Sequence, residues 1–393
     1  MPLPLRYSIG SLLARRVRTS LTVGVIALAV LATTLFGGLV SSMKRTLAST
    51  GDPRNLIVMR KGATNDGSSA VTLAAFQAIR FFEGVARDAA GQPLASPELV
   101  VQPFFRTKSG SARENVLVRG VEAVALQVHS DVSIAEGRMI RASSGEALVG
   151  RGVAGRYAGA QLGSELEFGR GSWRVVGIFE AKGSSLESEV WVDARELARD
   201  AKRPVPYSGV RLRVAPGADM DALARRIGDD PRYALEATRE TEYYAKQADS
   251  ANTFLLIVVG LAVLAGIGAA FGAINTLYAS VQARRAEIGT LRAIGFSRGA
   301  VLVAFLLESL ALALVGFAAG TLLAAIAGRA VSALLGGIGF AVNTFSTSVI
   351  EISVGLGDCL MALALSLAIG IVGGFFPAVR AARLQPVEAL RKG

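Results

Sequence analysis

The sequence predicts an α-helical membrane protein with four transmembrane helices and an α+β extracytoplasmic domain inserted between the first two helices. Three observations support this fold class: long stretches without a charged residue, one long block of ordinary polar composition, and a one-sided distribution of basic residues. Of the 393 residues, 51% are hydrophobic and 19% are charged, whereas charged residues make up about 25% of a typical soluble domain. The single cysteine excludes an intrachain disulfide, and the single histidine excludes the usual His/Cys zinc sites.

The amino-terminal region predicts a cytoplasmic interfacial helix at residues 1–18 and a first transmembrane helix at residues 19–43. Apolar residues of the first segment fall on one helical arc, as in helices that lie on a membrane surface. The second segment has no charge over 25 residues, and about 20 apolar residues span a bilayer. A cleaved signal peptide is the alternative, but its apolar region is usually about 7–15 residues long.

The segment between the first two transmembrane helices, residues 44–249, predicts a folded α+β domain on the far side of the membrane. Short β-branched runs indicate strands, and apolar residues at every third or fourth position indicate helices. The expected strands are residues 55–59, 99–105, 115–118, 172–179, 190–192 and 210–214, and the expected helices are residues 71–86, 193–198 and 219–227. Residues 64–69 indicate a loop. His129 lies beside Ser130 and Asp131, which favours a solvated surface histidine over a metal ligand.

Three further transmembrane helices are expected, at residues 250–281, 300–328 and 358–379. The first of them belongs to an uncharged stretch of 34 residues, 250–283. A helix of that length reaches roughly 50 Å, which exceeds an apolar layer of about 30 Å, so one end should project into water. Residues 329–357 also contain a long uncharged stretch, but its Gly, Asn, Ser and Thr residues make it a poor apolar segment. We therefore expect a periplasmic loop there.

The basic residues decide the number of crossings and their orientation. With four crossings, residues 1–18, 282–299 and 380–393 share one side, which carries twelve basic and two acidic residues, a net charge of +10 of the chain's +11. The basic residues are Arg6, Arg15, Arg16, Arg18, Arg284, Arg285, Arg292, Arg298, Arg380, Arg383, Arg391 and Lys392. The positive-inside rule makes this side cytoplasmic, whereas a fifth crossing would leave the last four outside. Because topology accounts for the charge, nothing is left to favour a nucleic-acid partner.

Two motif searches limit the enzyme classes. The sequence contains no Gly-Lys pair and therefore no Walker A phosphate loop, so any ATP hydrolysis that drives this protein is expected in another chain. Residues 355–358 read Gly-Leu-Gly-Asp, as in intramembrane aspartyl proteases. That chemistry needs two carboxyl groups, and no other predicted transmembrane segment contains an aspartate. We expect Asp358 to be a residue at a helix end.

An acid and several glycines inside the membrane segments are candidates for function and packing. Glu308 lies ten residues after Arg298, at a depth where a lone carboxylate is costly, so it should face protein. Two interpretations stay open: a member of a proton or substrate pathway, or a protonated or hydrogen-bonded packing residue near Ser309. Three Gly-x-x-x-Gly pairs permit close helix approach. These pairs are Gly268 with Gly272, Gly316 with Gly320, and Gly370 with Gly374.

The cytoplasmic segment 282–299 predicts a short amphipathic coupling helix. Aliphatic residues recur at helical spacing, a glycine indicates the helix end, and an arginine lies one turn before a glutamate. The arginines would pair with acids of a partner while the aliphatic ridge enters a groove. The alternative is a positively charged loop at the lipid surface. The candidate coupling residues are Arg284, Arg285, Glu287, Ile288, Leu291, Arg292, Ile294 and Gly295.

Several motifs together resemble the FtsX-like permeases of ABC transporters. Arg-Arg-Ala-Glu-Ile-Gly-Thr-Leu-Arg-Ala-Ile-Gly at residues 284–295, followed by Phe-Leu-Leu-Glu-Ser at 305–309, is similar to the signature of that family. Pro-Ala-Val-Arg-Ala-Ala-Arg at 377–383 and Pro-Val-Glu-Ala-Leu-Arg at 386–391 resemble its ending. In the exported segment, Glu-Gly-Arg at 136–138, Ala-Leu-Val-Gly at 147–150 and Trp-Arg-Val-Val-Gly-Ile-Phe at 173–179 resemble the MacB-type periplasmic core domain.

This resemblance implies a type VII, MacB-like architecture. Two permease chains and two ATPase subunits would pass ATP-driven motion to the periplasmic domains rather than open a membrane channel. The resemblance assigns ATPase docking to residues 284–295 and places Glu308 on an acid that is common in the signature. MacB carries an N-terminal ATPase domain that this sequence lacks, so we expect ATP and Mg to be used by a separate ATPase and no cofactor to be bound by this chain.

The resulting expectation is a non-catalytic permease subunit in a bacterial inner membrane, multi-pass, with both termini cytoplasmic. Its partners would be two ATPase copies, a second permease chain in a homo- or heterodimer, membrane lipids and, in an export system, a periplasmic adaptor. The expected role is efflux or extraction of a lipid, lipoprotein or hydrophobic compound. The alternative is an FtsX-like mechanotransmitter that controls an extracytoplasmic hydrolase. A receptor without an ATPase is a third hypothesis, which requires that aspartate at Arg285, Leu291 and Ile294 leaves function intact.

Overall fold

The computed structural model describes residues 16–108, 110, 113–335, 338–341, 347–350 and 352–384. The interfacial helix predicted at residues 1–18 and the tail predicted at 380–393 lie largely outside the described residues. The chain divides into two compact units. The membrane unit comprises Met1–Ser41, Thr253–Ala330 and Ile352–Gly393, and the extracytoplasmic unit comprises Ser42–Asn252 and Val331–Glu351.

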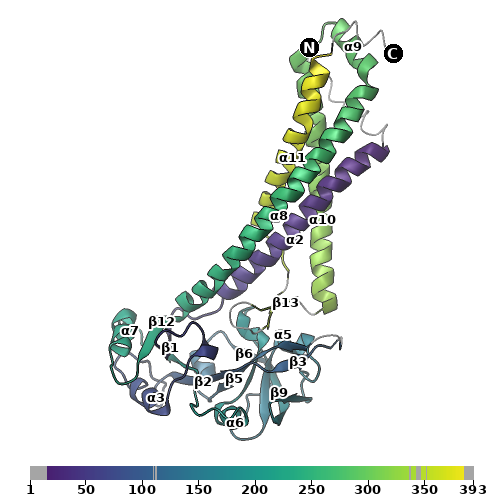
Figure 1. Cartoon of the computed structure of the whole chain (residues 1–393). Coiled ribbons are helices and arrows are strands. Elements are labelled where there is room, and N and C mark those ends of the chain that lie inside the picture. The colour runs from purple at the N-terminus through teal and green to yellow at the C-terminus, as the bar shows by residue number, and fades with distance from the viewer. Residues whose placement is uncertain are drawn as a thin grey trace. The chain divides into compact units, whose positions relative to one another are not determined.

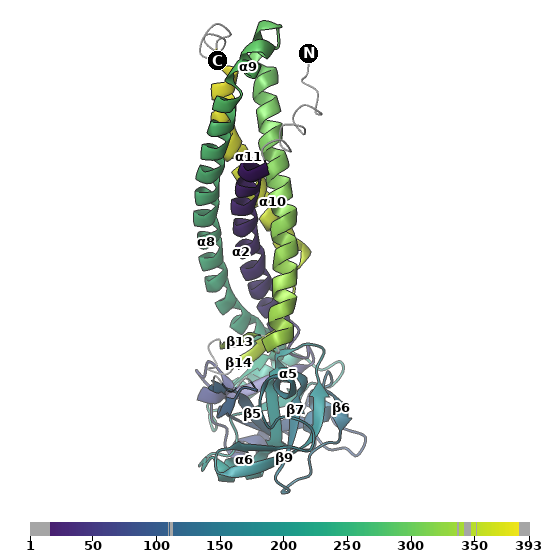
Figure 2. The same ribbon diagram turned by 90° about the vertical axis from the view of Figure 1, so that its right-hand side faces the viewer.

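The membrane unit is built from long apolar helices. They belong to α2 (Arg16–Ala48), α8 (Glu240–Ala283), α10 (Arg298–Leu335) and α11 (Leu356–Ala382), and a short helix, α9 (Arg285–Ala293), connects α8 with α10. Within this unit the four long helices run side by side in both views (Figures 1 and 2). Among the described residues, four stretches are long and apolar enough to cross a membrane: Thr19–Ala48, Leu255–Ala283, Arg298–Leu334 and Leu356–Ala382. The prediction of four transmembrane helices is therefore confirmed.

Apolar and polar contacts both hold these helices together. Ile26 of α2, Ala269 of α8 and Ile369 of α11 belong to one buried cluster. The hydroxyl of Ser366 in α11 donates to the Ala313 carbonyl of α10 at 2.7 Å. At the first turn of α11, the carboxylate of Asp358 accepts the Gly355 N–H at 2.9 Å and the Ser41 hydroxyl at 2.6 Å. Asp358 is therefore a helix-end residue, as its sequence context indicates.

The extracytoplasmic unit contains a long mixed β-sheet. The strand order is β12-β1-β11-β2-β5-β10-β7-β9-β6, and β8 pairs with β9 outside this path. The strands are β1 (Asn55–Arg60), β2 (Ala95–Val101), β5 (Leu117–Val121), β6 (Ser133–Gly137), β7 (Glu146–Gly150), β8 (Glu165–Phe168), β9 (Gly171–Glu180), β10 (Glu189–Asp193), β11 (Gly209–Arg213) and β12 (Leu235–Arg239). Two small hairpins accompany the sheet: β3 (Phe104–Arg106) with β4 (Arg113–Asn115), and β13 (Ile338–Ala341) with β14 (Thr347–Ile350).

Strand β2 divides the sheet into two half-domains, because its first part pairs with β11 and its last part pairs with β5. The first half-domain is β12, β1 and β11 with α3 (Leu73–Ile79) and α7 (Met220–Gly228), whose core includes Leu56, Phe76 and Leu212. The second half-domain is β5 to β10 with α4 (Ala125–Val128), α5 (Arg151–Arg156) and α6 (Ala194–Asp200). Its cores include Val149 and Trp191.

The α+β prediction is confirmed, but several predicted elements have the wrong extent. The helix expected at residues 71–86 is only α3, because Gly84 adopts a φ of +98° and Val85 forms a β-bridge with Val214. The strand expected at residues 99–105 is divided between β2 and β3 at Pro103, which has no N–H to donate. The loop expected at 64–69 contains a short 3₁₀ turn, η1 (Asp66–Ser68). The loop expected at 329–357 contains the β13–β14 hairpin, labelled in Figure 2.

Candidate functional site

The predicted coupling segment forms α9, with Arg284 and Ile294 at its two caps. Gly295 ends the helix with a φ of +108°. The Phe296 N–H donates to the Leu291 carbonyl at 3.1 Å and the Gly295 N–H donates to the Arg292 carbonyl at 3.3 Å. This is the Schellman arrangement, in which glycine is favoured because it adopts a positive φ without strain.

The aliphatic residues of α9 do not form one outward ridge, so that prediction is wrong. Ile288 is buried against Val281 of α8, Phe305 of α10 and Ala378 of α11. Leu291 is half-buried, and Ile294 is 72% exposed. The residues of α9 that face away from the bundle are Ala286, Glu287, Thr290, Ala293, Ile294 and Gly295, while Arg285 and Arg292 are half-buried. Helix α9 is thus packed into the membrane unit on one side and open on the other.

Arg284 is an internal partner of Glu308 and is not on the open face of α9. Its Nη1 lies 3.0 Å from Glu308 Oε2, and the two side chains are 6% and 7% exposed. Its Nε donates to the exposed carboxylate of Glu287 at 3.3 Å, and its guanidinium lies over the Phe305 ring. Burial of the Glu308 carboxylate requires a cation nearby, and Arg284 supplies it, while docking of a partner by Arg284 stays a prediction. Glu308 faces protein and is hydrogen-bonded, which agrees with its packing interpretation.

Two of the three predicted glycine pairs lie where helices approach closely. A Cβ on Gly316 or Gly320 of α10 would lie within 2.8 Å of Ile26 or Val30 of α2, so only glycine fits there. Gly370 and Gly374 of α11 face Ala313 and Ser309 of α10 in the same way. Within this chain the third pair makes no close approach: a Cβ on Gly268 would meet nothing within 4 Å, and one on Gly272 would make only an ordinary contact with Val25. A packing role for Gly268 and Gly272 stays a prediction.

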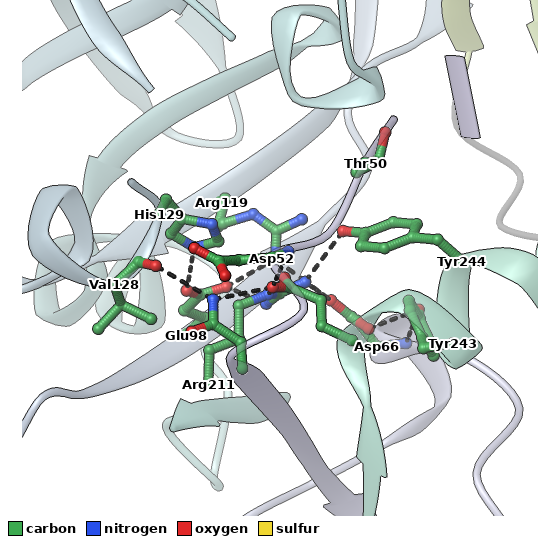
Figure 3. A network of polar contacts seen from close by, with 12 residues as sticks. Thr50, Asp52, Asp66, Glu98, Arg119, Val128, His129, Arg211, Tyr243 and Tyr244 are labelled. Carbon is green, nitrogen blue, oxygen red and sulfur yellow. Dashed lines mark hydrogen bonds and ion pairs between the residues drawn. The ribbon is translucent and has the colours of Figure 1, made fainter. Parts of the chain in front are cut away.

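The extracytoplasmic unit contains a buried charge network that the sequence did not predict (Figure 3). Its centre is Glu98 of β2, bound by Arg119 of β5 and Arg211 of β11. Both guanidinium groups also lie 3.2 Å from the same oxygen of Asp66. The network members are Asp52, Asn55, Asp66, Glu98, Arg119, His129, Glu189, Arg211, Arg213, Glu240, Tyr243 and Tyr244, which come from both half-domains and from the first turns of α8.

Every strong charge in this network has an opposite charge beside it. Arg119 makes a forked contact with Glu189, through Nε at 2.6 Å and Nη2 at 2.5 Å. Arg211 Nε donates to Glu240 at 3.0 Å, and Arg213 Nη2 donates to Asp52 at 2.6 Å. Forked arginine–carboxylate pairs fix the mutual orientation of the two groups. Buried charges with full pairing avoid the large cost of isolated ones.

Two acids of the network, Glu98 and Asp66, are ionised because nearby arginines outweigh the effect of burial on them. Burial raises the pKa of Glu98 and of Asp66, but the charges of Arg211 and Arg119 hold both pKa values below their ordinary range. Burial also raises the pKa of Tyr243 and Tyr244, so both phenols keep their protons. At neutral pH the carboxylates of Glu98 and Asp66 are therefore acceptors, and the Tyr243 hydroxyl is a donor to Asp66.

His129 corrects one sequence prediction directly. It is only 4% exposed, its Nε2 lies 2.7 Å from Glu98 Oε1, and its ring packs on Trp191. The prediction of a solvated histidine relied on neighbours in the chain, whereas Ser130 itself bonds to Asp52 in the network. A usable signal existed in the sequence, since Glu98, Arg119 and Arg211 each stand next to apolar residues in strands β2, β5 and β11.

In the part of the chain that the structure describes, two hollows border the network. The first, of about 40 Å³, is lined by residues that include Asp66, Arg119 and Tyr244 and has space for about three waters. The second, of about 640 Å³, is lined by residues that include Met59, Asn65 and Tyr243. Across the described residues, no group of three or more His, Cys, Asp or Glu side chains is arranged to hold a metal ion.

Two family models match most of the chain. The MacB-like periplasmic core domain matches residues 19–230, and the FtsX-like permease C-terminal model matches residues 257–386. The resemblance drawn from the sequence motifs is therefore confirmed. Residues 231–256, which lead into the second transmembrane segment, lie between the two matches.

Curated relatives share moderate identity with the chain. The macrolide export ATP-binding/permease protein MacB 1/2 of Paracoccus denitrificans is 31% identical over 245 residues, covering 60% of this chain and 35% of that protein. The pyoverdine export ATP-binding/permease protein PvdT of Pseudomonas entomophila is 28% identical, covering 62% and 37%. An uncharacterized ABC transporter permease of Methanocaldococcus jannaschii is 28% identical, covering 67% and 66%. The matched region thus spans about a third of the length of the first two relatives.

Proposed function

Because the chain belongs to the FtsX-like permeases that carry a MacB-like periplasmic core domain, we propose that it transmits the motion of a separate ATPase across the membrane to its extracytoplasmic domain. It is an ABC-transporter permease, and its membrane helices make it a multi-pass membrane protein. The proposed cargo class is a lipid, lipoprotein or hydrophobic compound. The proposed location is a bacterial inner membrane, with both termini and α9 cytoplasmic.

The packing of α9 is the observation that carries this proposal. Ile288 of α9 contacts α8, α10 and α11 together, and Arg284 binds Glu308 of α10. A force applied to the open face of α9 would therefore reach three transmembrane helices at once. A flexible charged loop at the lipid surface would need neither the buried aliphatic contact nor the buried ion pair.

The proposed assembly has two ATPase copies, which use ATP and Mg, and a second permease chain. The sequence itself contains no Walker A loop. The names of the relatives support this proposal, since MacB and PvdT are described as ATP-binding/permease proteins for export. In this proposal the chain takes no catalytic part in ATP hydrolysis.

The test is to replace Ile294 and Arg285 by aspartate together and to reconstitute the variant with the ATPase that co-purifies with the wild-type chain. Both changes place acids on or beside the open face of α9, so ATPase binding should fall by at least tenfold. The exposed Arg106 on the extracytoplasmic unit supplies the matched control, Arg106→Asp, which should bind normally. Unchanged binding of the α9 variant would contradict the proposal and favour the receptor hypothesis.

Extracytoplasmic partners that co-purify with the chain distinguish the export role from the alternative role, a mechanotransmitter that controls an extracytoplasmic hydrolase. An adaptor and outer-membrane duct would support export, whereas a cell-wall hydrolase would support the mechanotransmitter. Topology is tested by single cysteines at Arg285 and Lys246 in a Cys359→Ser background. Labelling of both from the same side of the membrane would contradict the proposed orientation.

A further inference from the structure

The buried charge network surrounds the two points where the chain leaves α2 and joins α8. After α2, the Thr50 hydroxyl donates to Ser185 at 3.1 Å, and the Asp52 N–H donates to Glu240 at 3.0 Å. Glu240 is the first residue of α8 and is only 2% exposed. The connections to α2 and to α8 are thus bonded to each other and to the sheet.

Three side chains of the first α8 turns hold that helix to the sheet. The carboxylate of Glu240 accepts the Asn55 side-chain amide at 2.8 Å and Arg211 Nε at 3.0 Å. The Tyr243 hydroxyl donates to Asp66 at 2.6 Å, and Arg211 donates to the Tyr244 hydroxyl at 3.3 Å. Positions 240, 243 and 244 lie on one helical face, so all three attachments act in the same direction.

Arg211 extends this attachment to the second half-domain. It shares Glu98 and Asp66 with Arg119, and Arg119 is forked onto Glu189 of β10. A line of directional bonds therefore runs from α8 through β11 and β2 to β5 and β10. Directional ionic contacts resist sliding and rotation, which an apolar interface of the same size tolerates better.

We propose that this network is a rigid joint: it makes the first turns of α8 and both half-domains one mechanical body. Glu240, Tyr243 and Arg211 are its positioning residues. The inference rests on the proposed motion-transmitting function, for which a helix must deliver its displacement to the domain without slipping. An attachment that only stabilised the fold would leave the orientation of α8 in folded molecules insensitive to loss of one bond.

The experiment measures that orientation in the full chain in lipid nanodiscs. Nitroxide labels replace the exposed residues Lys246 of α8 and Glu167 of β8 in a Cys359→Ser background. Pulsed electron–electron resonance then gives the distribution of distances between the labels. Wild type should give a single narrow distribution. Glu240→Gln should at least double its width, and Tyr243→Phe should broaden it less, since it loses only the bonds to the carboxylate and the N–H of Asp66.

A matched control lies one residue away. Arg239 forms exposed ion pairs with Asp221 and, at 3.9 Å, with Glu242 of α8. Exposed pairs contribute little, so Arg239→Gln should leave the distribution narrow. Tryptophan emission, which reports only on this unit because both tryptophans lie in it, identifies any variant that fails to fold. Hydrogen exchange at residues 241–247 should be at least tenfold faster in Glu240→Gln.

The proposal of a rigid joint would be overturned by equal widths of the distance distributions in wild type and in folded Glu240→Gln, or by equal broadening in Arg239→Gln and Glu240→Gln. Neither measurement uses an ATPase. Failure to find an ATPase partner would therefore contradict the proposed function while leaving the distance and exchange results to decide the joint on their own.

Discussion

Replacement of Glu308 by glutamine removes one charge from the buried pair with Arg284. Breaking a buried ion pair costs about 3–5 kcal/mol, because the remaining charge stays in a poorly solvated place. Arg284 also reaches Glu287, whose side chain is mostly exposed, so the loss should lie near the lower limit. We expect the free energy of unfolding of the membrane unit to fall by about 3 kcal/mol.

A double-mutant cycle tests whether this loss belongs to the pair. Glu308→Gln, Arg284→Gln and the double variant are unfolded by SDS in mixed micelles, and modification of Cys359 reports on the membrane unit. This thiol is the only one in the chain and lies in α11. The double variant should lose less than the sum of the single losses by at least about 1.5 kcal/mol. Losses that add to within about 0.5 kcal/mol would refute the reasoning.

Other predictions follow from glycine packing and from the acids of the network. Gly320→Leu should destabilise the membrane unit by more than about 2 kcal/mol, because its Cβ would lie 2.5 Å from the Ala27 carbonyl. Gly268→Leu is the control, because no atom of this chain lies within 4 Å of a Cβ there, and it should leave the result of the same thiol assay unchanged. Equal destabilisation by the two variants would contradict the prediction. The folded-state pKa values of Glu98 and Asp66 lie below their ordinary values of about 4. Their contribution to the free energy of unfolding is therefore complete above about pH 5 and is lost as pH falls below 4. Tryptophan emission during urea unfolding at decreasing pH measures this loss, which should shrink in Glu98→Gln; a stability that is constant down to pH 3 would contradict it.

The membrane helices were predictable because lipid imposes a simple requirement on sequence. Each span must satisfy its backbone as a helix and expose few charges, so uncharged stretches near residues 19–43 and 358–379 identify helices directly. The extracytoplasmic elements were less predictable. Whether residues 80–86 continue a helix depends on Gly84 and on pairing with distant Val214, which no local pattern contains.

The candidate site shows the same division between local and distant information. Gly295 predicted a helix end because the Schellman motif is local. The depth of Glu308 in its transmembrane segment indicated that this acid faces protein. Its partner Arg284 lies 24 residues away in the sequence and was expected to dock the ATPase. The members of the charge network are spread along the sequence from Asp52 to Tyr244. Only the pairing of distant strands brings them together, so no local pattern distinguished them from surface charges.

The bond between the Asp52 N–H and Glu240 joins the two ends of the folded segment that is inserted between α2 and α8. A folded module whose ends touch can be exchanged for another without changing the spacing of the two helices that it interrupts. Recombination at these two positions therefore gives a route by which permeases of one membrane design acquire different external modules. The same two positions are the natural boundaries for grafting a foreign domain into this chain.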